Sequence, residues 1–152
     1  MPRVLLAIVV LFCLSMSAPA DDGNASEDWF VKGNELLLQG RLDDAVAAYD
    51  LFLLNDSKNV AALSNKAAAL SLMGSFQEAV DLCDQATEIN ADYALAWSTK
   101  GDALTGLGRF QEAVTAYDRA LEINSETAMT WFNKGVALSN MGRFEEAVRA
   151  YN

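Results

Sequence analysis

Histidine is absent from this chain of 152 residues, and its absence excludes several kinds of chemistry. A protein without imidazole has no histidine general base, no histidine metal ligand and no histidine that titrates near neutral pH. Proline is scarce, and its two residues, Pro2 and Pro19, both lie near the N-terminus. The N-terminal segment therefore differs in composition from the remainder of the chain.

Positive charge is also scarce, because 11 lysine and arginine residues stand against 21 aspartate and glutamate residues. The formal net charge of −10 repels phosphate backbones, so we expect no nucleic-acid partner. Hydrophobic residues make up 52% of the chain and charged residues 21%, which is typical of a folded protein. The length has room for one domain or for about three to four short repeats.

Residues 1–20 have the three parts of a secretory signal peptide. Arg3 provides a basic start, an apolar run extends from residue 4 to residue 14, and Ala18-Pro19-Ala20 forms the small-residue end. As a helix, the run would span about 16 Å, roughly half of the hydrocarbon core of a membrane. We expect cleavage near Ala20 and export to the periplasm, the cell envelope or the extracellular space. An uncleaved N-terminal anchor is the alternative, and it is the only membrane contact that we expect.

After a short acidic leader, residues 21–25, the sequence repeats itself with a period of 34 residues. A fixed period of this size indicates a repeat architecture. The columns in register include Trp29, Leu63, Trp97 and Trp131; Lys32, Lys66, Lys100 and Lys134; Leu36, Leu70, Leu104 and Leu138; Gly40, Gly74, Gly108 and Gly142; and Tyr49, Cys83, Tyr117 and Tyr151. We expect the tryptophans to pack in the core and the lysines to lie at a solvated edge near acidic neighbours. Cys83, the one cysteine that remains after cleavage, is expected to be a buried and unreactive thiol.

Within one period, apolar and small residues recur at intervals of three or four, which predicts two amphipathic helices. Gly108 lies between them and is the residue type that most easily takes the left-handed conformation of a tight turn. Small residues at Gly101 and Ala113 predict a close approach of the paired helices. A leucine at Gly101 is expected to overpack that contact.

These columns resemble the tetratricopeptide repeat (TPR) family, whose unit carries a Trp, Gly, Leu, Gly, Phe/Tyr, Ala, Tyr/Phe and Ala pattern. The resemblance covers units at 26–59, 60–93, 94–127 and 128–152, the last of them incomplete. Leu63, Cys83 and Phe52 depart from the pattern, and the family's inter-repeat proline is missing. The resemblance implies an all-α fold, a right-handed solenoid of stacked antiparallel helix pairs whose first helices line a concave groove.

The resemblance also implies the function of an exported scaffold or adaptor that binds a protein or a peptide in this groove. The residues that it places along the groove are Phe30, Asn34, Leu37, Ser64, Asn65, Ala68, Leu95, Ser98, Thr99, Asp102, Met129, Phe132, Asn133 and Val136. Their side chains are mixed apolar and neutral-polar, with no basic residue among them.

One subset of the family grips the C-terminal carboxylates of heat-shock chaperones with three basic residues and two asparagines. The asparagines map onto Asn34 and Asn65 and are present. The basic members map onto Phe30, Leu95 and Thr99 and are absent, so the cations that would pair with a carboxylate are missing. We therefore expect no co-chaperone function of this kind.

Catalytic patterns are missing as well. The sequence has no activated nucleophile, no phosphate loop and no metal-ligand cluster, so we expect no enzymatic activity, no cofactor and no metal site. The alternative function is that of an N-terminal regulatory region in a longer and enzymatic chain.

Charge is uneven along the units, with net values of −4, −4, −2 and +1 from the first to the fourth. From this we hypothesise that a basic segment docks on the first two units. The fourth unit stops within its second helix, which predicts either a fragment of a longer chain or an apolar edge covered by another subunit of a homo-oligomer.

Overall fold

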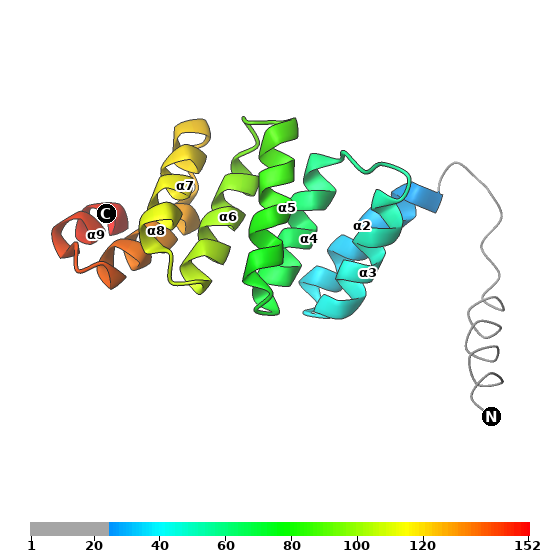
Figure 1. Cartoon of the computed structure of the whole chain (residues 1–152), viewed down its shortest axis with the longest axis horizontal. Helices are drawn as coiled ribbons and strands as arrows, with labels where there is room; N and C mark the ends of the chain where they lie inside the picture. Colours follow the sequence, from blue (N-terminus) through cyan, green and yellow to red (C-terminus); the bar gives the residue numbers. More distant parts are fainter. Residues whose placement is uncertain (1–24) are drawn as a thin grey trace, which may run out of the picture.

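The computed structural model describes residues 25–152, and within this range it consists of eight helices and no strands. The helices are α2 (Ala25–Leu38), α3 (Leu42–Leu53), α4 (Val60–Leu72), α5 (Phe76–Ile89), α6 (Ala94–Gly106), α7 (Phe110–Ile123), α8 (Ala128–Asn140) and α9 (Phe144–Tyr151). They follow one another in a row in chain order (Figure 1). The expected signal peptide lies outside the described residues. In the described range no helix has the length and apolar character that crossing a membrane requires.

Each helix pair turns at a glycine with a left-handed backbone, as the sequence predicts. At the turn between α6 and α7, Gly108 has a φ of +74°. Its N–H donates to the Thr105 carbonyl at 3.0 Å, and the N–H of Arg109 donates to the Leu104 carbonyl at 2.9 Å. These two bonds satisfy carbonyls that the helix end leaves open, and the positive φ explains the glycine at this position.

The packing order of the helices gives the row an inner and an outer surface. Each helix packs against the next one along the chain, and the first helices of successive pairs also contact each other, as α2 with α4, α4 with α6 and α6 with α8. In residues 25–152 no Cα atoms of two second helices lie within 8 Å of each other. The first helices are therefore crowded on the inner side of the curved row, and the second helices spread on the outer side. This arrangement is the all-α solenoid of helix pairs that the resemblance implies.

The repeated columns form a core cluster that continues through the second, third and fourth units, and the first unit has a cluster of its own. The leucine column is buried at Leu36, Leu70, Leu104 and Leu138. Trp97 and Trp131 are half-buried and pack against the largest core cluster. Their indole N–H groups donate to the carbonyls of Ala91 and Ser125, both at 2.8 Å, and so tie the start of each first helix to the preceding loop. The tryptophans thus seal the edge of the core and are not fully inside it.

A glycine of the first helix faces the ring of a tyrosine of the second helix in three of the four units. A Cβ built on Gly101 would lie 2.5 Å from Cε1 of Tyr117, and Gly33 and Gly135 would meet Tyr49 and Tyr151 at 2.6 and 2.3 Å. These distances are far shorter than van der Waals contact, so the tyrosine column requires glycine opposite it. The unit with Cys83 has Ala67 instead, because the smaller thiol leaves room for a methyl group.

The lysine column joins successive units through ion pairs. Lys66 pairs with Asp50, and Lys100 and Lys134 pair with Asp84 and Asp118 at 2.5 Å. In each pair the lysine lies on a first helix and the aspartate on the second helix of the preceding unit. The ammonium groups of Lys100 and Lys134 also lie 5.3 and 5.1 Å from the ring centres of Trp97 and Trp131. The expected acidic neighbours are therefore specific partners, and they neutralise these lysines.

Candidate functional site

The candidate site is the inner surface that α2, α4, α6 and α8 form together. Of the fourteen residues predicted to line it, the structure leaves four exposed, namely Leu95, Asp102, Met129 and Phe132. Eight are half-buried, namely Phe30, Asn34, Leu37, Asn65, Ala68, Ser98, Asn133 and Val136. These twelve side chains have surface that a ligand can touch.

The prediction is wrong for the other two residues, Ser64 and Thr99. Their exposed fractions are 0% and 4%, so neither offers surface to a ligand. The Ser64 hydroxyl donates to the Val60 carbonyl of its own helix at 2.7 Å. Of the three contacts between first helices, the one between α4 and α6 is the most extensive. This closeness buries Thr99.

A polar bridge joins α2 and α4 across the first joint between units. Asn34 lies at its centre, and its Oδ1 accepts hydrogen bonds from the hydroxyl of Tyr49 and from Nδ2 of Asn65, both at 2.8 Å. Burial raises the pKa of Tyr49 to about 12, so the hydroxyl keeps its proton and acts as a donor. The bridge spans three helices and holds the amide of Asn34 in one orientation.

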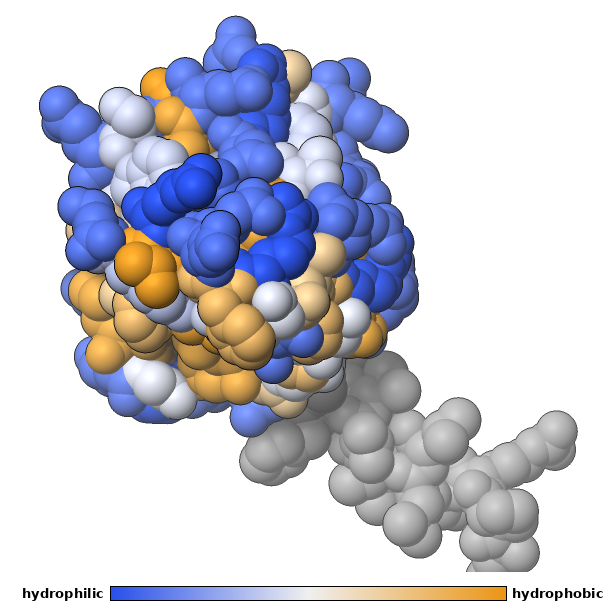
Figure 2. All heavy atoms as spheres, turned by 90° about the vertical axis from the view of Figure 1, so that its left-hand side faces the viewer, coloured by the Kyte–Doolittle hydropathy of each residue, from blue (hydrophilic) through white to orange (hydrophobic). Residues whose placement is uncertain are grey.

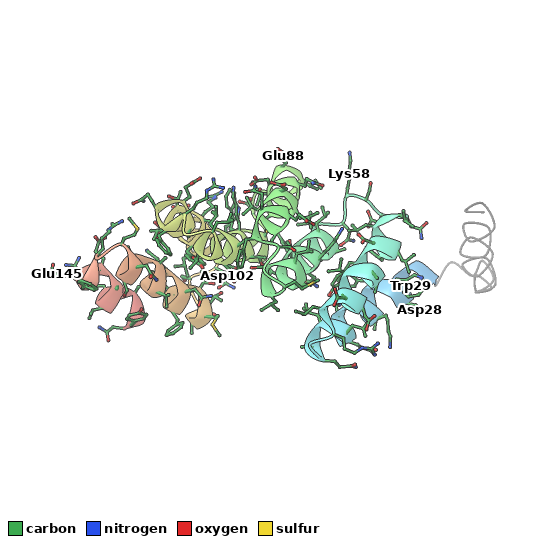
Figure 3. The ribbon with its side chains drawn as sticks, turned by 60° about the horizontal axis from the view of Figure 1, so that its bottom comes forward. Asp28, Trp29, Lys58, Glu88, Asp102 and Glu145 are labelled. Atoms are coloured by element: carbon green, nitrogen blue, oxygen red, sulfur yellow. The ribbon has the colours of Figure 1, made fainter. Side chains whose placement is uncertain are left out.

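An equivalent bridge joins α6 and α8, but an acid takes the central position. Oδ1 of Asp102 accepts from the hydroxyl of Tyr117 at 2.7 Å and from Nδ2 of Asn133 at 2.8 Å. The hydroxyl of Thr105 lies 3.3 Å from that of Tyr117. A hollow of about 180 Å³ lies beside this bridge, and its lining consists of Asp102, Thr105, Tyr117, Asn133 and Val136. In Figure 3, Asp102 lies towards the middle of the row, whereas Asp28 and Glu145 mark its two ends.

Surrounding protein atoms raise the pKa of the Asp102 carboxyl, and the hydrogen bonds from Tyr117 and Asn133 oppose that rise without cancelling it. Asp102 is nevertheless partly exposed to solvent. Its carboxyl group therefore contacts protein atoms on one side and faces the groove on the other. Burial and the neighbouring carboxylate of Asp102 raise the pKa of Tyr117 as well. The tyrosine therefore remains a neutral donor beside the acid.

The joint between the two bridges carries no such polar centre. Ala68 and Cys83 occupy the positions that Asn34 and Tyr49 hold in the first unit. Burial is the main cause that raises the pKa of Cys83 to about 12, so the thiol stays protonated, as expected of a structural cysteine. The described residues include no group of acids and cysteines arranged to hold a metal ion.

Replacing Asp102 with asparagine is expected to stabilise the protein at neutral pH, by less than about 1 kcal/mol because the side chain is partly exposed. Asparagine keeps an acceptor for Tyr117 and Asn133, as Asn34 does in the first bridge. A raised pKa in the folded state means that ionisation costs folding free energy. The stability of the wild type relative to the variant therefore falls as the pH rises from the ordinary value of 3.8 through the raised pKa, and is constant above it.

Thermal denaturation of both proteins between about pH 3 and pH 8 measures this difference, whose pH-dependent part should vanish at the acid end. Glu88→Gln, at an exposed position of α5, is the matched control and should change stability by less than about 0.5 kcal/mol at every pH. An Asp102→Asn variant that is less stable than the wild type at neutral pH would contradict the prediction.

A second surface lies at the α9 end of the row. Figure 2 views this end, where hydrophobic residues gather over one part of the face. The large exposed apolar side chains of α8 and α9 are Met129, Phe132, Phe144, Val148 and Tyr151. A hollow of about 570 Å³ lies between these helices and includes Trp131 and Phe132 in its lining. The apolar edge expected of the fourth unit is present, and that another subunit covers it stays a prediction.

Sequence reasoning misses two residues of the bridges, Tyr49 and Tyr117. Their column predicts packing in the core, and it gives no sign that the hydroxyl groups reach the edge of the groove. The sequence contains one signal that could reveal the bridges. An amide or an acid recurs at Asn34 and Asp102, and an asparagine follows each of them 31 residues later.

Solved structures with this architecture include known TPR domains. MamA superposes with a TM-score of 0.75 at 24% identity over 86% of this chain and 76% of the other, a likeness that shows the fold. The TPR domain of Arabidopsis OM64 gives 0.72 at 25% identity over 76% and 96%. The first TPR domain of RPAP3, in a complex with the HSP90 peptide SRMEEVD, gives 0.67 at 25% identity over 88% and 98%.

The sequence comparisons agree with the structural ones. A curated relative, the inactive TPR repeat-containing thioredoxin TTL3 of Arabidopsis thaliana, is 34% identical over 74 residues, which are 49% of this chain. The match spans 11% of the length of that relative. The model of the tetratricopeptide repeat family matches residues 59–125 and 92–152. These matches cover more than half of the sequence, and the chain belongs to the tetratricopeptide repeat family.

Proposed function

We propose that this protein is an exported scaffold or adaptor that binds a segment of another protein on the inner surface of α2, α4, α6 and α8. The observation that carries the proposal is the surface itself. It combines exposed apolar side chains, such as Leu95 and Phe132, with two oriented polar bridges. Apolar contacts supply affinity and the bridges supply polar groups in defined positions, which is the usual composition of a peptide-binding groove.

The groove does not suit the C-terminal carboxylates of a chaperone. Phe30, Leu95 and Thr99 stand where the clamp of the resembling subset needs cations, and Thr99 is buried. The nearest lysines, Lys66 and Lys100, are engaged with Asp50 and Asp84 of the preceding units. Without free cations, desolvating a carboxylate here would not be compensated.

Photocrosslinking in the native host tests the proposal. A benzoylphenylalanine at position 95, which lies on α6 and is 44% exposed, should yield a crosslinked protein whose attached segment is identified by mass spectrometry. The same probe at the exposed Glu88 of α5 is the matched control and should not capture that segment. The mature chain should begin near Asp21 if the expected export signal is cleaved.

Two outcomes would overturn the proposal. Equal capture of one segment at positions 95 and 88, or no capture at position 95, would remove the support for a groove ligand. The peptide SRMEEVD should not compete with the captured segment. Competition by this peptide would show that the groove accepts a carboxylate terminus after all.

A further inference from the structure

Acidic residues are nearly absent from the inner helices of the second, third and fourth units. In α4, α6 and α8 the only acidic residue is Asp102. The basic residues of these helices are Lys66, Lys100 and Lys134, and each pairs with an aspartate of an outer helix. The inner surface of these three units therefore carries one carboxylate, whereas most of the acids of the chain lie on the second helices and in the loops.

The carboxylate of Asp102 is held in place by neutral groups. Both of its hydrogen bonds, from Tyr117 and from Asn133, end on Oδ1. No ion pair among the described residues includes Asp102. Neutral donors orient a carboxylate but do not balance its charge, so the group keeps a negative potential beside the hollow that it lines.

We propose that this hollow is a subsite for a cationic side chain, lysine or arginine, of the protein segment that binds in the groove. The inference rests on the proposed function. An ammonium or guanidinium group placed there would pair with the one uncompensated carboxylate of the three inner helices and gain charge-assisted hydrogen bonds. The hollow of about 180 Å³ has room for the head of such a side chain. The raised pKa of Asp102 agrees with an acid that lacks a cationic neighbour.

The first joint provides an internal comparison. Asn34 accepts the same two hydrogen bonds from Tyr49 and Asn65 that Asp102 accepts from Tyr117 and Asn133. The two bridges have the same hydrogen-bond geometry, and only the charge of the central side chain differs. Among the inner helices of the second, third and fourth units, the one carboxylate thus places the basic contact at the third unit, although the net charges of the units favour the first two.

Two blocked pentapeptides serve as probes, each with four alanines and a central residue that is arginine in one and citrulline in the other. Citrulline keeps the shape of arginine and removes its charge. In NMR titrations of the mature wild-type protein, the arginine peptide should change the chemical shifts of Asp102, Tyr117 and Asn133. It should bind at least about fivefold more tightly than the citrulline peptide. This preference should shrink as the salt concentration rises, because the added interaction is between charges.

Three variants complete the experiment. Asp102→Asn keeps the acceptor for both donors and should abolish the preference for arginine over citrulline. Asn34→Asp should create a second arginine site at the first joint, reported by shifts at Tyr49 and Asn65. Glu88→Gln removes the same unit of charge away from the groove and should leave the preference unchanged. Equal binding of the two peptides to the wild type, or an unchanged preference in Asp102→Asn, would overturn the proposal.

The two proposals fail in different ways. If the probe at position 95 still captures its segment when Asp102→Asn is introduced, with unchanged yield, the groove function stands and the cationic subsite does not. If the arginine peptide binds at Asp102 while no segment is captured at position 95, the subsite stands and the scaffold function does not.

Discussion

Replacing Gly101 with alanine is expected to lower the free energy of unfolding by about 1–3 kcal/mol, although alanine is the better helix former. The new Cβ would lie 2.5 Å from Cε1 of Tyr117, a ring that is 1% exposed. Because this ring is buried in the core and hydrogen-bonded through its hydroxyl to Asp102, displacing it disrupts both the packing and the hydrogen bond. Urea denaturation followed by circular dichroism measures the shift of the midpoint.

The second unit of the same chain suggests the control for this prediction. There Ala67 stands opposite Cys83, so a methyl group is accepted where the ring is absent. In a Tyr117→Cys background, Gly101→Ala should therefore change sign and stabilise the protein by about 0.5–1 kcal/mol, because only the helix propensity remains. The double-mutant cycle reports the difference as a coupling energy. A loss of stability from Gly101→Ala that is the same in both backgrounds would contradict the steric explanation.

Replacing Leu104 with alanine is expected to cost about 2–5 kcal/mol of folding free energy. Leu104 is 1% exposed and belongs to the largest buried cluster, which extends from α4 to α9. The lost methyl groups leave a cavity in the buried cluster that helices of neighbouring units share. Thermal denaturation of the variant measures the cost.

Leu72→Ala is the matched control for this second prediction. Leu72 also lies on a first helix but is 69% exposed, so its truncation should change stability by less than about 0.5 kcal/mol. Equal effects at Leu104 and Leu72 would mean that the leucine column does not hold the units together. Hydrogen exchange should show that the opening caused by Leu104→Ala is greatest in α6 and α7 and their neighbours.

Much of the local structure follows from the repeat. The period predicts the helix pairs, and Gly108 predicts a left-handed turn that the structure confirms. The burial of Cys83 follows from its place in an aromatic column. These features depend on backbone geometry and on residues close together in the chain, and one sequence is enough to reveal them.

The sequence does not predict how deeply each side chain at the groove is buried. Ser64 and Thr99 have the spacing of groove residues but are buried, because α4 and α6 approach each other more closely than the other inner helices. That separation depends on the packing of whole units. It cannot be obtained from the pattern of a single helix.

The sequence by itself determined the architecture of this protein, because a strict period of packing residues permits one way of stacking helix pairs. Only the tertiary structure decided where the polar groups meet. Each bridge joins residues that are 31 positions apart on two inner helices and a tyrosine from a third helix. Such contacts form only when neighbouring units are stacked at a fixed angle and distance. For that reason the chemistry of Asp102 depends on the assembled solenoid and not on the unit that carries it.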